Sequence, residues 1–207
     1  MLRSWDRIDR YYMELLGDLY PQPADEGHTA WATDIIDKWI PMIKPLKTIL
    51  DVGCGVGFCQ PIIEKHGVKY TGIAIGKDVM DAQKMRYKVA DMDFNFLEYP
   101  DKSFDLIFSR HSLEHSPFPL LSLMEWHRVA RNWLILVLPT PRSFRWGGRN
   151  HYGIMSASQA RFLLERAGWA RLWEDHIEEE FRFFCSKVDR VATLDDIKEE
   201  YEVEEEE

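Results

Sequence analysis

The stretch that decides the fold is Ile49-Leu50-Asp51-Val52-Gly53-Cys54-Gly55-Val56-Gly57. The apolar residues before it and at its start predict a short buried strand over 47–51, and three alternate glycines then lead into a helix within 53–66. Glycine permits positive φ angles and lets a ligand approach the main chain closely. The first N–H groups of a helix also lack partners within the helix. The pattern therefore predicts a ligand-binding loop directly after the first strand.

Two common glycine-rich loops do not fit this stretch. A dinucleotide-binding G-x-G-x-x-G motif would place its third glycine at position 58, which is Phe58. A Walker loop would require a Gly-Lys-Ser or Gly-Lys-Thr sequence, and none follows. The alternative that remains at this point is a glycine-rich turn with only a structural role.

Strands and helices are expected to alternate around the loop. The apolar patterns predict strands over 47–51, 68–74, 86–90, 104–109, 133–138, 169–176 and 180–187. Helices are predicted over 4–19, 29–43, 78–84, 118–131 and 156–167. Such alternation indicates an α/β fold in which a parallel sheet has helices on both faces. Ligands of these folds bind beyond the carboxyl ends of the strands.

Four stretches together resemble the class I S-adenosylmethionine-dependent methyltransferases, of the type 11 kind. Residues 51–57 match the first motif of that family, (D/E)xGxGxG. Residues 104–115, with Phe-Asp-Leu-Ile-Phe-Ser and then Leu-Glu-His, resemble its fourth-strand motif. Residues 133–139 resemble the fifth strand with its final proline, and 150–169 resemble a later helical stretch that ends in Ala-Gly-Trp. The resemblance covers about residues 47–187 in the order of the family.

The resemblance implies a doubly wound, Rossmann-like sheet of seven strands, mostly parallel with one antiparallel strand. We expect an N-terminal helical cap over residues 1–44, the methyltransferase domain over 45–190 and an acidic tail over 191–207. The implied activity is that of a methyltransferase (EC 2.1.1.-). It would move a methyl group from S-adenosylmethionine by SN2 displacement to an oxygen, nitrogen or carbon of a small acceptor, and it would release S-adenosylhomocysteine.

The resemblance also assigns cofactor contacts. The residues implied are Asp51, Gly53, Cys54, Gly55, Gly57, Ala74, Ile75, Asp91, Met92 and Ser109. The glycines would contact the methionine part and the ribose. Asp91 would accept from the adenine amino group, with Met92 beside the ring, and Asp93 competes with Asp91 for that role.

One position departs from the family pattern. The second strand of such proteins usually ends in an acid that binds the ribose hydroxyls, but this chain has Ala74 there, and the first acid that follows is Asp78. Losing one hydrogen bond to a charged group costs roughly 1.5–3 kcal/mol of affinity. Three alternatives follow: weak cofactor binding, replacement by Asp78, or a non-catalytic cofactor-binding module of the same fold.

Catalytic and acceptor residues are expected after the fourth and fifth strands. His111 follows the fourth strand and is the candidate general base, because a neutral imidazole can take a proton from an acceptor. A loop histidine without a catalytic role is the alternative. Arg110, Arg145, Arg149 and His151 are the candidate acceptor-binding residues. Their arginines suggest an anionic acceptor, since guanidinium groups pair with carboxylates and phosphates.

Residues 111–115, His-Ser-Leu-Glu-His, also match the HxxEH motif of zinc hydrolases. On a helix, His111 and His115 would face the same side and could bind zinc, with Glu114 as the base. The preceding strand and the two following prolines, Pro117 and Pro119, argue against a helix here. A zinc hydrolase is therefore the less favoured alternative, and no metal is expected.

Charge and composition limit the partners. The formal net charge of the chain is −9, and residues 195–207 hold nine of its 35 acidic residues and one of its 26 basic residues. Residues 1–194 are therefore nearly neutral, which does not favour DNA as a partner. No apolar run reaches about 18 residues, so no membrane span is expected. The three cysteines form no CxxC pair, which favours a reducing compartment and a cytoplasmic location. The oligomeric state stays open.

Overall fold

The computed structural model describes residues 4–17, 27–141, 150–177 and 179–189. Within these ranges one sheet contains β1 (Thr48–Val52), β2 (Lys69–Ala74), β3 (Val89–Asp91), β4 (Phe104–Arg110), β5 (Ala130–Pro139), β6 (Trp169–Ile177) and β7 (Glu180–Lys187). The α-helices are α1 (Ser4–Gly17), α2 (Gly27–Trp39), α3 (Gln60–Glu64), α4 (Lys77–Met85), α5 (Pro119–Val129) and α6 (Ala157–Arg166). Two short 3₁₀ helices cover Ile40–Met42 and Leu113–His115.

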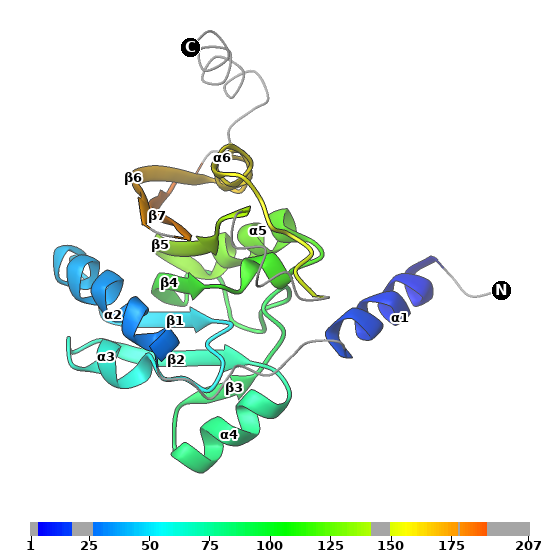
Figure 1. Ribbon diagram of the computed structural model, residues 1–207, viewed down its shortest axis with the longest axis horizontal. Helices are drawn as coiled ribbons and strands as arrows, with labels where there is room; N and C mark the ends of the chain where they lie inside the picture. Colours follow the sequence, from blue (N-terminus) through cyan, green and yellow to red (C-terminus); the bar gives the residue numbers. More distant parts are fainter. Residues whose placement is uncertain (1–3, 18–26, 142–149, 178, 190–207) are drawn as a thin grey trace, which may run out of the picture.

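The strand order of the sheet is β3-β2-β1-β4-β5-β7-β6. The neighbours from β3 to β5 pair in parallel, whereas β7 runs antiparallel to both β5 and β6. This confirms the predicted seven-stranded sheet with one antiparallel strand. The order reverses between β1 and β4, and ligands of such sheets bind beside this switch point. The loop after β1 lies there (Figure 1).

Helices cover both faces of the sheet because successive side chains of a strand point to opposite sides. Leu50 and Val52 of β1 belong to a buried cluster that includes Trp126 of α5. Ile49 of the same strand belongs to a second cluster that includes Ile36 of α2. The doubly wound arrangement is thus confirmed by the alternation within β1 itself.

Some element boundaries differ from those expected. The third strand begins at Val89 and not at residue 86, because Arg86 has a φ of 63° and ends α4. The fifth strand begins at Ala130, since that residue is already extended where a helix to residue 131 was expected. None of the helices within the described ranges combines the length and apolar character that crossing a lipid bilayer requires.

Helix α1 lies beyond the carboxyl ends of β1 and β2 (Figure 1). The Tyr12 hydroxyl donates a hydrogen bond to the Asp93 carboxylate, and Asn95 Nδ2 donates to the Tyr12 hydroxyl over 2.7 Å. The Tyr12 ring also contacts Phe96 and Phe118, with ring centroids 5.8 and 5.9 Å apart. One tyrosine therefore connects α1 to the loops that follow β3 and β4.

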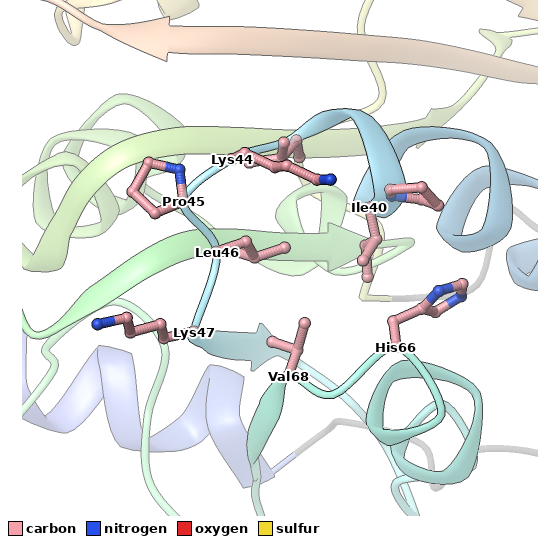
Figure 2. Close-up of a pocket in the computed structure, with 9 residues that line it drawn as sticks. Ile40, Lys44, Pro45, Leu46, Lys47, His66 and Val68 are labelled. Carbon is pink, nitrogen blue, oxygen red and sulfur yellow. The ribbon is translucent and has the colours of Figure 1, made fainter.

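A shallow groove of about 700 Å³ lies at the opposite edge of the sheet. Figure 2 shows Leu46 and Lys47, just before β1, together with Val68, just before β2, and His66. These residues precede the strands, whereas the predicted ligand loop follows them. The groove therefore contains none of the residues that the sequence assigned to the cofactor.

Candidate active site

The glycine loop has a backbone that only glycine adopts easily. Gly53, Gly55 and Gly57 have φ angles of 66°, 55° and 89°. A Cβ atom on Gly53 would lie 2.3 Å from Ser112 Oγ, and one on Gly57 would lie 2.9 Å from a methyl group of Val89. Both the positive φ angle and the lack of space thus exclude other residues at these two positions.

Hydrogen bonds hold the glycine loop between its two neighbouring strands. The Cys54 amide donates to the Ile73 carbonyl of β2 over 2.9 Å. From the other side, the Ser112 hydroxyl, which follows β4, donates to the Val52 carbonyl over 3.0 Å. The loop therefore has a fixed position at the switch point of the sheet.

The Asp51 carboxylate lies beneath this loop and is almost completely buried. The Tyr70 hydroxyl of β2 donates to Asp51 Oδ2 over 2.9 Å. Burial raises the pKa of Asp51 to about 7, and the hydrogen bond from Tyr70 opposes that rise only in part. Gly72 makes room for this contact, because a Cβ there would lie 2.6 Å from the Tyr70 hydroxyl. Asp51 thus connects the start of the glycine loop to Tyr70 of β2.

The ends of β2 and β3 place the predicted adenine and ribose residues side by side. Ala74 pairs with Asp91 in register, and the Met92 amide donates to the Ala74 carbonyl over 3.0 Å. Asp91 is exposed and Met92 is half-buried. The competing residue, Asp93, accepts hydrogen bonds from Tyr12 and from its own loop. Asp91 is consequently the better placed of the two acids to meet a ligand.

The acid nearest to Ala74 along the chain, Asp78, lies in the first turn of α4. The pKa of the Cys54 thiol is raised well above its usual value, first by burial and then by negative charges that include Asp51 and Asp78. Asp78 therefore acts on the glycine loop electrostatically. Its position is compatible with the replacement role that the sequence suggested.

His111 lies directly after β4 and has a φ of 51°. Its Nε2 atom is 3.1 Å from Glu180 Oε1, at the start of β7. Arg110 and Arg182 also donate to the Glu180 carboxylate, at 2.7 and 2.8 Å. Burial alone would raise the pKa of Glu180, but the His111 hydrogen bond and the nearby Arg110 charge lower it to about 2. Sequence reasoning missed Glu180, because no local motif surrounds it.

The structure also places the other residues expected near the acceptor. Arg110 is 10% exposed in its side chain and turns toward Glu180. Ser109 is completely buried within β4, next to Val52 of β1. Arg145 and Arg149 lie outside the described residues.

The HxxEH residues do not form a helical metal site. His111 is left-handed, and Leu113–His115 is a single 3₁₀ turn, so His111 and His115 do not share an α-helical face. Instead, Glu114 and His115 lie with His151 in one cluster. Burial raises the pKa of Glu114 to about 8 and lowers that of His115 to about 4. The His115 and His151 rings have centroids 4.5 Å apart.

Comparison with known proteins shows similarity to methyltransferases in sequence and in fold. Residues 50–137 match the family model described as a methyltransferase domain. The fold matches that of a SAM-dependent methyltransferase from Archaeoglobus fulgidus with a TM-score of 0.64 at 16% identity, over 76% of this chain and 94% of that one. The chain is thus similar to a methyltransferase domain in sequence, and its fold matches that of a SAM-dependent methyltransferase.

Two curated methyltransferases are similar to this chain in sequence. Ajmaline N-methyltransferase of Rauvolfia serpentina is 30% identical over 154 residues, which cover 65% of this chain and 52% of that protein. A ubiquinone biosynthesis O-methyltransferase of Coxiella burnetii is 29% identical over 105 residues, or 47% and 42% of the two chains. This chain thus spans about half the length of the curated relatives it matches. Their names differ in the acceptor atom, nitrogen in one and oxygen in the other.

The protein from Archaeoglobus fulgidus, whose fold this chain shares, is a SAM-dependent methyltransferase, so S-adenosylmethionine is the group to compare with the residues of this chain. The residues present fit this group at the glycine loop, because Gly53 and Gly55 have no side chain and are only half-buried at the switch point. They also fit at the end of β3, where the Asp91 side chain is exposed. At the end of β2 they depart from the family pattern, since Ala74 has no polar side chain.

Proposed function

We propose that this protein is a methyltransferase that transfers the methyl group of S-adenosylmethionine to a small-molecule acceptor. The observation that carries the proposal is the glycine loop, which combines three positive φ angles with a fixed position at the switch point of the sheet. In this proposal Gly53, Gly55 and Gly57 lie against the methionine part and the ribose. When bound, S-adenosylmethionine supplies an electrophilic methyl group that an acceptor atom takes by in-line SN2 displacement.

The remaining cofactor residues act as positioning groups in this proposal. Asp91 accepts from the adenine amino group, and Met92 lies beside the ring. Asp78 binds the ribose hydroxyls in place of the acidic residue that the family usually has at the position of Ala74. Asp51 keeps the loop in place through Tyr70, and so its contribution to binding is indirect. Holding both reactants in line supplies much of the rate of such a transfer.

His111 is the proposed general base for an acceptor hydroxyl or amine. Its Nε2 atom lies 3.1 Å from Glu180 Oε1, so Nδ1 is the nitrogen proposed to take the proton. The charge of Glu180 stabilises the imidazolium that forms after proton transfer, as a carboxylate does beside a catalytic histidine. Arg110 and Arg182 fix this carboxylate from its other sides.

The acceptor is proposed to be a small anionic molecule. Arg145 and Arg149 follow β5 in the sequence, and their guanidinium groups suit a carboxylate or phosphate. His151 follows them. Arg110 is less suited to a direct contact with the acceptor, because its guanidinium group is already engaged with Glu180. Its proposed role is therefore to hold Glu180 beside His111.

A second candidate function is cofactor binding without methyl transfer. It is favoured by one observation, the apolar side chain of Ala74 where the family usually has an acid. The two candidates share the fold and the glycine loop, so only turnover separates them.

The test combines cofactor binding with turnover. Calorimetry should show that one S-adenosylhomocysteine binds per chain, and labelled S-adenosylmethionine should transfer its methyl group to an acceptor fraction of a cell extract. His111→Gln should lower kcat by ~10²–10⁴-fold and leave S-adenosylhomocysteine affinity unchanged. His66→Gln, a surface histidine paired with Asp37, is the matched control. No heat with millimolar ligand would overturn the proposal, whereas binding without transfer would select the second candidate.

A further inference from the structure

We propose that Glu114, His115 and His151 form a binding site for a divalent transition metal, with Zn²⁺ as the expected ion. One ligand atom from each of the three residues lies within 4.8 Å of the other two. Two imidazoles and one carboxylate are a ligand set that zinc accepts. Glu114 and His115 come from the turn after β4, whereas His151 comes from the segment before α6. Only the fold brings the three together.

Glu114 is the first argument for an ion at this place. The residue is 1% exposed, and its Oε2 atom accepts no hydrogen bond from any residue that the structure describes. A buried carboxylate oxygen without a donor is costly, and proteins generally satisfy such atoms. A cation between Glu114 and the two histidines satisfies it directly.

His115 is the second argument, because a hydrogen bond determines which of its two nitrogens carries the proton. His115 Nδ1 lies 3.1 Å from the Asn150 carbonyl oxygen. A carbonyl oxygen can only accept, so Nδ1 carries the proton and Nε2 keeps its lone pair. Histidines that bind metals typically donate their second N–H to a carbonyl or carboxylate in this way. The hydrogen bond thus prepares His115 for coordination through Nε2.

The segment that carries His151 is fixed against the other two ligands. The Gly153 amide donates to the Glu114 carbonyl over 2.8 Å. A Cβ on Gly153 would lie 3.5 Å from the Leu113 carbonyl oxygen, so the two segments are in close contact. The ligands around tetrahedral zinc are about 3.4 Å apart, so the proposed ion draws together three ligand atoms that now lie within 4.8 Å of one another.

The proposed site differs from the HxxEH site that the sequence suggested. His111 is turned toward Glu180 and is not a ligand, and Glu114 is a ligand and not a base. Three protein ligands leave one position of a four-coordinate zinc ion open. In a role that rests on the proposed function, this position receives an oxygen of the acceptor, since zinc polarises bound oxygens.

The test measures metal binding without any methyl transfer. Untagged protein is stripped with a chelator and titrated with Zn²⁺ by calorimetry, and with Co²⁺ by visible absorption, which reports the coordination geometry. We expect one ion per chain. Glu114→Gln and His151→Gln should each weaken Zn²⁺ binding by at least ~100-fold, because loss of a supporting residue alone costs ~10–100-fold. His66→Gln, at a surface ion pair, should bind as the wild type does.

Separate outcomes decide the site and its role. Thermal unfolding without metal checks that each variant folds, and the near-isosteric Glu114→Gln keeps the size of the buried side chain. Absence of binding to folded wild-type protein, or unchanged affinity in both folded ligand variants, would overturn the site. Zinc binding that leaves the KM and kcat of methyl transfer unchanged would overturn only its role toward the acceptor. Neither result bears on S-adenosylhomocysteine binding, which tests the proposed function.

Discussion

Single residues fix the geometry of the glycine loop, and Gly53 shows this most clearly. Its φ of 66° is unfavourable for residues with a Cβ, and its neighbour Ser112 leaves no room for one. The same Ser112 side chain donates to the Val52 carbonyl, so it has little freedom to move away. A substitution at Gly53 therefore disturbs both the loop and the segment after β4.

Gly53→Ala and Gly67→Ala separate these two effects. Gly67 has a φ of 74°, but a Cβ added there would meet nothing within 4 Å, so Gly67→Ala should lose only about 1–2 kcal/mol of unfolding free energy. Gly53→Ala carries the same backbone cost together with the contact to Ser112. It should lose more stability and bind S-adenosylhomocysteine at least ~10-fold more weakly, as measured by urea unfolding and calorimetry. Equal losses of stability and affinity in the two variants would contradict this account.

At the scale of elements, Tyr12 connects α1 to the loops beside the proposed cofactor site. The Tyr12 hydroxyl meets Asp93 and Asn95, and the Tyr12 ring meets Phe96 and Phe118. These four residues belong to the loops after β3 and β4, beside the proposed cofactor site. The position of α1 is thus set at the carboxyl edge of the sheet, where a cap over the ligand is expected.

Tyr12→Phe should loosen α1 without unfolding the sheet. The substitution keeps the ring contacts and removes the hydroxyl, which lowers the local stability of α1 by about 1–2 kcal/mol. Hydrogen exchange should become ~5–30-fold faster in α1 amides, with the thermal midpoint of the sheet unchanged. Tyr11→Phe on the same helix, at a ring that is 53% exposed, is the control and should exchange as the wild type does. Unchanged exchange in Tyr12→Phe would show that the hydroxyl does not hold α1.

For the whole molecule, the buried Asp51 carboxyl links global stability to pH. Its pKa in the folded protein is about 7, against the usual 3.8, because burial disfavours the charged form. Below pH 3.8 the Asp51 carboxyl is neutral in both the folded and the unfolded state, so it does not lower the free energy of unfolding. Between pH 3.8 and 7 the folded state holds the proton more tightly, so the contribution of this group to stability falls as pH rises. Above pH 7 the loss is complete and amounts to roughly 4 kcal/mol.

Asp51→Asn should remove this dependence, since the amide oxygen still accepts from Tyr70 and does not ionise. The variant should be more stable than the wild type above pH 7, and the difference should shrink toward pH 4. Urea unfolding from pH 4 to 9 measures both profiles. Asp91→Asn, at an exposed aspartate, should retain the wild-type profile. A constant difference between Asp51→Asn and the wild type at all pH values would contradict the assignment.

The sequence by itself determined the alternation of elements, the glycine loop and the resemblance to methyltransferases. These features are local, because periodicity and glycine spacing act on residues close together in the chain. It also indicated Asp91 and Asp93 as competing acids. The contact between Asp93 and Tyr12 favours Asp91, and that contact spans 81 positions in the sequence.

Only the tertiary structure decided which distant side chains meet. Glu180 reaches Arg110 across 70 positions, and it orients His111 although no local motif marks it. A helix over residues 111–115 would have placed His111 and His115 on one face. The left-handed backbone at His111 instead points the two histidines to different places. His151 joins His115 instead, because parallel strands place their carboxyl ends at one edge of the sheet whatever their distance in sequence.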